Sequence, residues 1–354
     1  MKKIVLTGGG TAGHVTPNIA LLPRLREAGY QVDYIGSYRG MEKGLVQKAG
    51  LPYHGISSGK LRRYFSLKNA TDVFRVAKGY FEALSLLKKL RPNLVFSKGG
   101  FVSVPVVLAA KSLGIPAIIH ESDMTPGLAN RIAMRGAVKV CCNFPETLKY
   151  LPPNKAVLTG SPIRQELLHG DPARAYAFTG FSQDKPILLI IGGSLGSVFI
   201  NRAVRESLDR LLPHYQIIHL CGKGNLDPSL DHLDGYRQYE YISDELPDLF
   251  AAADLIVSRA GANAICELLS LRKPNILIPL SASASRGDQI LNARSFEKQG
   301  FSYVIEEEAC NKDSLQEAID YVSSHASHYI AAMEDSGQMD SIGKILDLFE
   351  TIAR

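Results

Sequence analysis

The sequence predicts an α/β protein with two domains, each a parallel sheet wound with helices on both faces. Three observations support this prediction. Short, fully apolar runs of the kind that form buried parallel strands alternate with helical segments along the chain. With 354 residues, the chain is too long for one ordinary hydrophobic core. Two glycine-rich turns, GGGTAGH at residues 8–14 and GGSLG at residues 192–196, each follow an apolar run and open a helical segment.

In the first half of the chain, we expect five strands and four helices. Pro17 and Pro105 lie in the first turns of two of these helices, where a proline is tolerated. The expected strands lie near residues 3–7, 31–35, 93–97, 116–120 and 138–142, and the helices near residues 17–28, 70–90, 103–113 and 126–135.

After residue 161 the pattern starts again, with strands expected near residues 186–191, 216–220, 254–258, 275–279 and 302–305. We therefore place the domain boundary there, giving an N-terminal domain of residues 1–161 and a C-terminal domain of residues 162–354. Whether the last helix packs back on the N-terminal domain stays open. Two facing Rossmann-like domains would leave a cleft between the carboxyl ends of their sheets, where ligands of such sheets bind.

Composition and cysteine usage are those of a globular protein that we expect in the cytosol. Hydrophobic residues make up 45% of the chain, with no secretory leader and no apolar run that approaches the roughly 18 residues of a membrane span. The five cysteines are odd in number and form no CxxC pair, so buried thiols are expected rather than disulfides or a zinc site.

The net charge of +5 is unevenly distributed, with +15 in residues 1–161 and −10 in the remainder. Much of the excess lies in residues 60–91, where basic side chains alternate with aromatic ones such as Tyr64, Phe65, Phe74 and Phe81. Such a stretch is typical of a protein that lies on an anionic membrane surface. The solvated face of a long surface helix is the alternative. No nucleic-acid partner is expected.

Both glycine-rich turns predict binding of phosphorylated ligands. A turn from a strand into a helix presents backbone N–H groups and the positive end of the helix dipole to an anion. Gly8, Gly10 and Gly13 also match the pattern G-x-G-x-x-G of dinucleotide-binding proteins. That fingerprint needs an acidic residue at the end of the second strand, whereas Asp33 lies inside it. An NAD-dependent oxidoreductase and a purely structural turn remain alternatives.

Polar residues beside these turns are candidates for catalysis and sugar binding. His14 directly follows the first turn and can accept a proton near neutral pH, although a lone histidine is also common as a structural residue. Glu267, in a helix that we expect Asn263 to cap, can accept two hydrogen bonds from a ribose diol or merely complement the helix dipole. Gln289 and Asn292 form an i,i+3 pair whose amides can bind sugar hydroxyls.

No D-x-D motif occurs in the sequence. A diphosphate leaving group would therefore be neutralised by helix N-termini and by Arg164 rather than by a bound metal. We expect neither a metal nor a cofactor.

Six motifs, in this order, resemble the MurG family of GT-B glycosyltransferases over nearly the whole chain. They are GGTAGHVTP at residues 9–17, KGGFVSVP at 98–105, HESD at 120–123, GSPIR at 160–164, GGS at 192–194 and RAGANAICE at 259–267. The resemblance implies inverting transfer of N-acetylglucosamine from UDP-N-acetylglucosamine to lipid I, undecaprenyl-pyrophosphoryl-MurNAc-pentapeptide. The product is lipid II for peptidoglycan synthesis. A peripheral location on the cytoplasmic face of the cell membrane is also implied.

The resemblance also implies residue roles, with His14 as the catalytic base. Ser194 and Arg164 would lie by the donor phosphates, Ile242 would meet the uracil through its backbone, and Glu267 would bind the ribose. The full set implied for substrate binding is Thr11, Ala12, Gly13, Asp123, Arg164, Ser194, Ile242, Ala262, Asn263, Ala264, Glu267, Gln289 and Asn292.

Two alternatives with the same fold stay open. One is a hexosyltransferase that acts on another membrane lipid such as diacylglycerol. The other is a non-catalytic paralogue that binds the nucleotide sugar and recruits partners, against which the presence of His14 counts.

Overall fold

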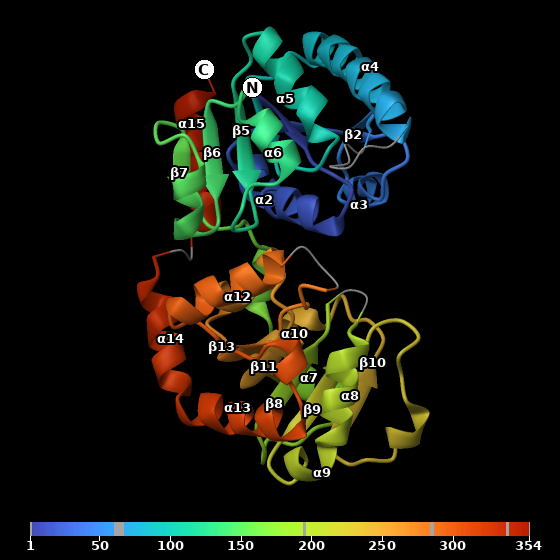
Figure 1. Ribbon diagram of the computed structural model, residues 1–354, viewed down its shortest axis with the longest axis vertical. Coiled ribbons are helices and arrows are strands. Elements are labelled where there is room, and N and C mark those ends of the chain that lie inside the picture. The colour runs from blue at the N-terminus through green and yellow to red at the C-terminus, as the bar shows by residue number, and fades with distance from the viewer. Residues whose placement is uncertain (1, 60–66, 194–195, 284–286, 338–339, 354) are drawn as a thin grey trace. The chain divides into compact units, whose positions relative to one another are not determined.

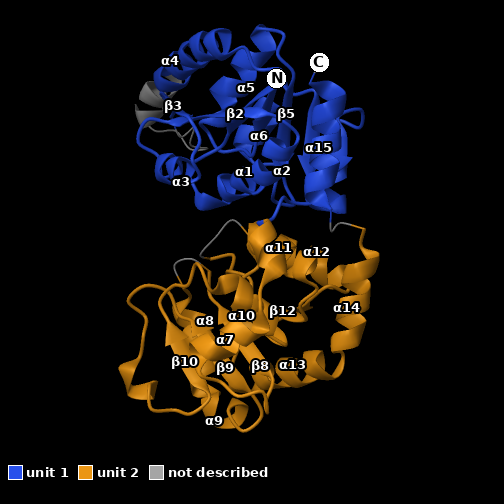
Figure 2. Ribbon diagram, turned by 180° about the vertical axis from the view of Figure 1, so that it is seen from behind, with its two compact units in different colours: residues 1–164, 340–354 blue, residues 165–339 orange. Residues whose placement is uncertain are grey.

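The computed structural model describes residues 2–59, 67–193, 196–283, 287–337 and 340–353. The chain divides into two compact units, one of residues 1–164 with 340–354 and one of residues 165–339 (Figure 2). The first unit thus extends three residues beyond residue 161 and includes the C-terminal helix. Among the described residues, no helix has both the length and the apolar character needed to cross a lipid bilayer.

The first unit is built on a seven-stranded parallel sheet (Figure 1). Its strands are β1 (Lys3–Thr7), β2 (Gln31–Ser37), β3 (Tyr53–Ile56), β4 (Leu94–Ser97), β5 (Ala117–Glu121), β6 (Lys139–Cys142) and β7 (Ala156–Leu158). The strand order is β3-β2-β1-β4-β5-β6-β7, so β1 lies between β2 and β4. The order of the strands reverses between β1 and β4, which is where ligands bind in doubly wound sheets.

Helices cover both faces of this sheet. Side chains of consecutive strand residues point to opposite faces, so Ile4 and Leu6 join one core cluster and Val5 joins the other. The helical elements are η1 (Ala12–His14), α1 (Thr16–Ala20), α2 (Leu22–Glu27), α3 (Glu42–Lys48), α4 (Leu67–Leu90), α5 (Ser103–Ser112), α6 (Leu128–Ala133), η2 (Pro145–Tyr150) and α15 (Ser341–Ile352).

Helix α15 completes the core of the first unit, although it comes from the opposite end of the chain. Its apolar stripe enters the cluster that contains β1, and the ring of Phe349 packs edge-on against Phe96 of β4, with centroids 5.1 Å apart. Ser341 Oγ donates to the carbonyl of Ser161 at 2.6 Å, and Tyr30 donates to Glu350 at 2.7 Å. The last helix is therefore an integral part of the N-terminal unit.

The second unit repeats the architecture with a six-stranded parallel sheet in the order β10-β9-β8-β11-β12-β13. The strands are β8 (Ile187–Ile191), β9 (Gln216–Leu220), β10 (Tyr236–Tyr239), β11 (Leu255–Ser258), β12 (Asn275–Leu277) and β13 (Tyr303–Val304). The helical elements are η3 (Gln165–His169), α7 (Pro172–Thr179), α8 (Val198–Glu206), α9 (Leu208–Leu211), η4 (Pro228–Leu230), α10 (Leu246–Ala252), α11 (Ala262–Leu271), α12 (Asp288–Lys298), η5 (Glu307–Ala309), α13 (Lys312–Ser324) and α14 (Ala326–Asp335).

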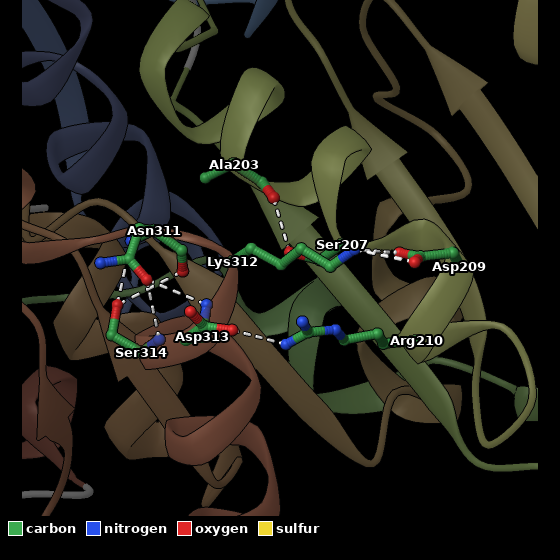
Figure 3. A network of polar contacts seen from close by, with 8 residues as sticks. All are labelled: Ala203, Ser207, Asp209, Arg210, Asn311, Lys312, Asp313 and Ser314. Atoms are coloured by element: carbon green, nitrogen blue, oxygen red, sulfur yellow. Dashed lines mark hydrogen bonds and ion pairs between the residues drawn. The ribbon is translucent and has the colours of Figure 1, made fainter.

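Helix α13 begins with a capping box and two ion pairs (Figure 3). Asn311 Oδ1 accepts from the backbone N–H groups of Asp313 and Ser314, and Ser314 Oγ accepts from the N–H of Asn311 at 2.9 Å. Lys312 pairs with Asp209 at 2.7 Å, and Asp313 pairs with Arg210 at 2.6 Å. These exposed pairs orient α13 against α9 and each contribute little stability.

The predicted α/β class with two parallel Rossmann-like sheets is confirmed, as are ten of the strands. Three further strands, β3, β7 and β10, were not predicted from the sequence. All three lie at sheet edges. All five cysteines are buried free thiols, as expected.

Replacing Phe349 by alanine tests the contribution of α15. The change leaves a cavity beside Phe96, and truncation of a buried phenylalanine typically costs about 3–5 kcal/mol. We expect the free energy of unfolding of the first unit, measured by denaturant titration, to fall by about that amount. Asp347→Ala, on the exposed face of the same helix, should change it by less than about 0.5 kcal/mol. Equal effects of both substitutions would contradict a core role for α15.

Candidate active site

The first candidate site is formed by the loops that leave β1 and β4 of the N-terminal unit. Lys98 N–H donates to the Thr7 carbonyl at 3.0 Å, so the two loops start as neighbours. They then touch, because Gly100 has φ +84° and a Cβ atom there would collide with the carbonyl of Gly9. Only glycine combines this backbone conformation with so close an approach.

His14 ends η1 within the first loop and is half-buried. Thr11 Oγ1 lies 3.0 Å from its Nδ1 atom. Burial, together with the positive charge of Lys98, lowers the pKa of His14 to about 4, while the Gly9 backbone and the charge of Glu42 act in the opposite direction. The imidazole is therefore neutral at physiological pH and can accept a proton.

Lys98 is buried behind this histidine in a polar cluster. Its ammonium donates to His120 Nδ1 at 2.9 Å and to Ser161 Oγ at 3.2 Å, and His120 Nε2 lies 2.8 Å from the Gly160 carbonyl. Nδ1 therefore accepts and Nε2 donates. Burial and the lysine charge hold the pKa of His120 well below its usual value. The cluster ties the ends of β4, β5 and β7 together.

Glu121 organises the loop that follows β5. Its buried carboxylate accepts from the N–H groups of Asp123 at 3.1 Å and Gly127 at 3.0 Å, and from Asn130 Nδ2 at 2.9 Å. Burial raises the pKa of this carboxyl to about 7, against the opposing effect of the Asn130 bond. Asp123, a predicted binding residue, is thus positioned through its backbone by its neighbour.

The second candidate site lies in the C-terminal unit, at the corresponding point between β8 and β11. Arg259 follows β11 and is buried, donating to Ser197 Oγ at 2.7 Å and to the Ile278 carbonyl at 3.1 Å, and pairing with Glu307. This guanidinium fixes the glycine-rich turn after β8 to the loops after β11 and β12. Ser194 of that turn lies outside the described residues.

Helix α11 begins at this edge of the sheet with Ala262, followed by Asn263, Ala264 and, more than one turn later, the half-buried Glu267. The prediction that Asn263 caps the helix is wrong. The N-cap residue is Gly261, which has no side chain, so the helix begins two residues earlier than a cap at Asn263 requires. As at any helix N-terminus, the first backbone N–H groups have no acceptor within the helix and point toward the preceding loop.

The two amides of α12 lie on one side of the helix but contact different loops. Gln289 Oε1 accepts from the Leu280 N–H at 3.0 Å, whereas the buried Asn292 donates to the Ala260 carbonyl at 3.4 Å. Asn292 therefore supports the loop after β11. Ile242 follows β10 and is buried, and Arg164 is a half-buried residue at the end of the first unit.

Several polar residues of these sites were not singled out from the sequence as site residues. Glu42, Glu121, Arg259 and Glu307 are acidic or basic residues with buried or nearly buried side chains. Glu121 and Arg259 lie at strand ends, whereas Glu42 and Glu307 begin α3 and η5. The position of Glu121 and Arg259 directly after predicted strands is a signal in the sequence, but it does not identify their partners.

Both halves of the chain match known domains. Residues 4–142 match the glycosyltransferase family 28 N-terminal domain, and residues 187–345 match the glycosyltransferase family 28 C-terminal domain. The chain thus has the two domains of a family 28 glycosyltransferase.

Similar proteins narrow this class further. The chain is 65% identical to a protein of Lachnospira eligens and 64% identical to one of Lachnoclostridium phytofermentans, in both cases over 99% of each chain. Both are named UDP-N-acetylglucosamine--N-acetylmuramyl-(pentapeptide) pyrophosphoryl-undecaprenol N-acetylglucosamine transferase. The crystal structure of Acinetobacter baumannii MurG superposes with a TM-score of 0.79 at 26% identity, covering 99% of this chain and 100% of that one. The chain belongs to the MurG family.

The low pKa of His14 predicts a specific pH dependence. The imidazole should stay neutral from pH 8 to below pH 6 and titrate near pH 4, as measured by NMR of labelled histidine. The unfolded chain takes up this proton near the ordinary value of about 6.5. The contribution of His14 to stability is therefore complete above that pH and is lost as the pH falls toward 4.

In the variant His14→Gln this contribution is absent, so its stability should fall less than that of the parent protein between pH 6.5 and pH 4. A His14 midpoint near 6.5, or identical acid dependence of both proteins, would show that the imidazole is not desolvated.

Proposed function

We propose that this protein transfers N-acetylglucosamine from UDP-N-acetylglucosamine to the MurNAc sugar of lipid I, giving lipid II, with inversion at the anomeric carbon. The observation that carries the proposal is the full-length identity of 64–65% to transferases whose names describe this reaction. Two polar loop clusters at equivalent points of the two sheets are consistent with a reaction that has two phosphorylated ligands.

In the proposed reaction, His14 accepts the proton of the acceptor sugar hydroxyl. The hydroxyl oxygen forms a bond to the anomeric carbon as the bond from that carbon to the UDP oxygen breaks, and UDP leaves with the electron pair. One base suffices for inversion. The pKa of about 4 describes His14 without substrate. An anionic pyrophosphate bound beside it would raise that pKa and make the imidazole a stronger base.

The first glycine turn, with Thr11, Ala12 and Gly13, would approach the acceptor and the transferred sugar. The C-terminal unit would hold the donor, with Glu267 accepting hydrogen bonds from the ribose diol and Gln289 contacting the sugar. Ser194, Arg164, Ile242, Ala262, Asn263, Ala264 and Asn292 would complete the donor site, and Asp123 would belong to the acceptor side.

An assay with defined donors and acceptors tests the reaction. Labelled UDP-N-acetylglucosamine and UDP-glucose are each offered with lipid I and with diacylglycerol. We expect transfer of N-acetylglucosamine to lipid I. Transfer to diacylglycerol alone would instead identify a hexosyltransferase of another membrane lipid, and binding without turnover would identify a non-catalytic paralogue.

His14→Ala tests the proposed base. A positioned base typically contributes about 10²–10⁴-fold, so kcat should fall by about that factor. The affinity for UDP-N-acetylglucosamine, measured by calorimetry, should change little, because the proposed donor site lies in the other unit. His14→Gln should be similarly impaired, whereas His54→Gln, at a histidine paired with Asp33 in the same unit, should keep its rate. Normal kcat in both His14 variants would exclude the base role.

We propose further that the protein works at the cytoplasmic face of the membrane, with α4 against the anionic surface. Phe74 and Phe81 are 78% and 68% exposed, and Lys78 lies between them at helical spacing. The inner side of α4 packs on α5, where Tyr80 bonds to Ser112 at 2.8 Å. Tyr64 and Phe65, also part of the predicted surface, lie outside the described residues.

Replacing Phe74 and Phe81 by serine and Lys78 by glutamate should weaken binding to vesicles that contain anionic lipid by about tenfold or more. Each basic residue near such a surface contributes about 1 kcal/mol, and exposed aromatic rings insert at the interface. Sedimentation with vesicles measures the change. Lys149→Glu with Tyr150→Ser, at an exposed cation–aromatic pair of η2, is the matched control and should bind normally. Equal binding of both variants would contradict the role of α4.

A further inference from the structure

Glu42 is a fully buried carboxylate that contacts the first glycine turn from behind. It is the first residue of α3, and it is 0% exposed. Its Oε1 atom accepts from both the N–H of Ser37, at 2.9 Å, and the hydroxyl of Ser37, at 2.5 Å. Its Oε2 atom accepts from the N–H of Gly10 at 3.3 Å. The carboxylate therefore joins the end of β2 to the turn after β1.

Two glycines make room for this carboxylate. A Cβ atom at Gly9 would lie 2.7 Å from Cδ of Glu42, and one at Gly40 would overlap the carboxylate itself. The backbone at Gly9 and at Gly40 therefore lies so close to the carboxylate that neither position has room for a side chain. Burial of a charge is costly unless hydrogen bonds compensate it, and an acid at the start of a helix could complement the dipole equally well from solvent. Stabilisation of α3 does not require this position.

The turn is also held from its other end. Tyr34 donates to the Gly8 carbonyl at 2.9 Å, and Asn18 donates both to Tyr34, at 3.3 Å, and to the Thr7 carbonyl, at 3.0 Å. Tyr34 therefore fixes the carbonyl of Gly8, and Glu42 fixes the N–H group of Gly10, on either side of Gly9. The carboxylate is the charged member of this pair.

The charge of Glu42 acts on the groups around it. It raises the pKa of His14, and it adds to burial, the larger cause, in raising the pKa of the Tyr34 and Tyr53 hydroxyls, which stay neutral donors. The charged groups that act on His14 are Glu42 from α3 and Lys98 from the loop after β4, and they act in opposite directions.

We propose that Glu42 is a positioning residue for the proposed transfer: its carboxylate fixes the backbone of residues 8–10 and places a negative charge behind the turn that leads to His14. The expected effect of Glu42 on the reaction rate rests on the proposed function. Its effects on the glycine turn and on the His14 imidazole can be measured in the protein without substrate. Glu42 touches neither substrate nor reacting atoms in this proposal.

The chain contains a matched carboxylate without this function. Glu82 of α4 accepts from the N–H of Ser57 at 2.5 Å and from its hydroxyl at 3.3 Å, just after β3. The arrangement repeats that of Glu42 and Ser37, but among the described residues Glu82 bonds to Ser57, Tyr38 and Lys78 and not to a glycine turn or to His14. Glu82→Gln is therefore the control for loss of a structural carboxylate.

The test compares Glu42→Gln with Glu82→Gln. In Glu42→Gln, the His14 midpoint measured by NMR should move to lower pH, because the neutral amide no longer stabilises the imidazolium. With a soluble analogue of lipid I, kcat should fall about tenfold while KM for UDP-N-acetylglucosamine stays within about twofold. Glu82→Gln should leave the midpoint and kcat unchanged. An unmoved His14 midpoint in Glu42→Gln, or equal losses in both variants, would overturn the proposal.

Glu42→Asp separates position from charge and serves if Glu42→Gln does not fold. It keeps the charge but withdraws the carboxylate from Gly10, so kcat should fall while the His14 midpoint moves less than in a neutral variant. Unchanged kcat in Glu42→Asp would contradict the positioning role. The NMR titration needs no turnover, so it reports on Glu42 even if His14→Ala shows that His14 is not the base.

Discussion

The contact between the backbones of Gly9 and Gly100 determines the geometry of the first site. It joins the two loops at the point where the strand order reverses, and it is possible only because Gly100 has no side chain. Because the loops touch, His14 from one loop and Lys98 from the other influence each other directly. The buried acid behind Gly9 fills the remaining space, so three charged or titratable groups from distant parts of the sequence share one small region.

The central part of each sheet could be predicted from the sequence, and the edges could not. Central strands such as β1 and β8 are buried on both faces and read as continuous apolar runs. The missed strands β3, β7 and β10 are edge strands, and segments such as YHGI and YRQY carry polar residues because one side of an edge strand has no partner strand. Periodicity alone does not distinguish them from loops.

The candidate site was predictable to a similar extent. Glycine turns and the nearby His14 are local in sequence, so pattern and spacing locate them. Buried polar partners are not local: the residues that bond to Lys98 are 22 and 63 positions away, and Glu42 reaches back 32 positions to Gly10. The misplaced helix cap at Asn263 has a different cause: propensity favours a capping side chain over glycine, but the helix begins directly after Gly261, whose backbone is extended.

The return of α15 to the first unit has a consequence for synthesis of the protein. The segment of residues 165–339 is continuous, so all of its residues have been synthesised before α15 is made. The first unit begins earlier but needs Phe349 and its neighbours to close one side of its sheet. In the cell, the N-terminal unit is therefore expected to finish folding last, with the apolar face around β1 exposed until α15 becomes available to cover it.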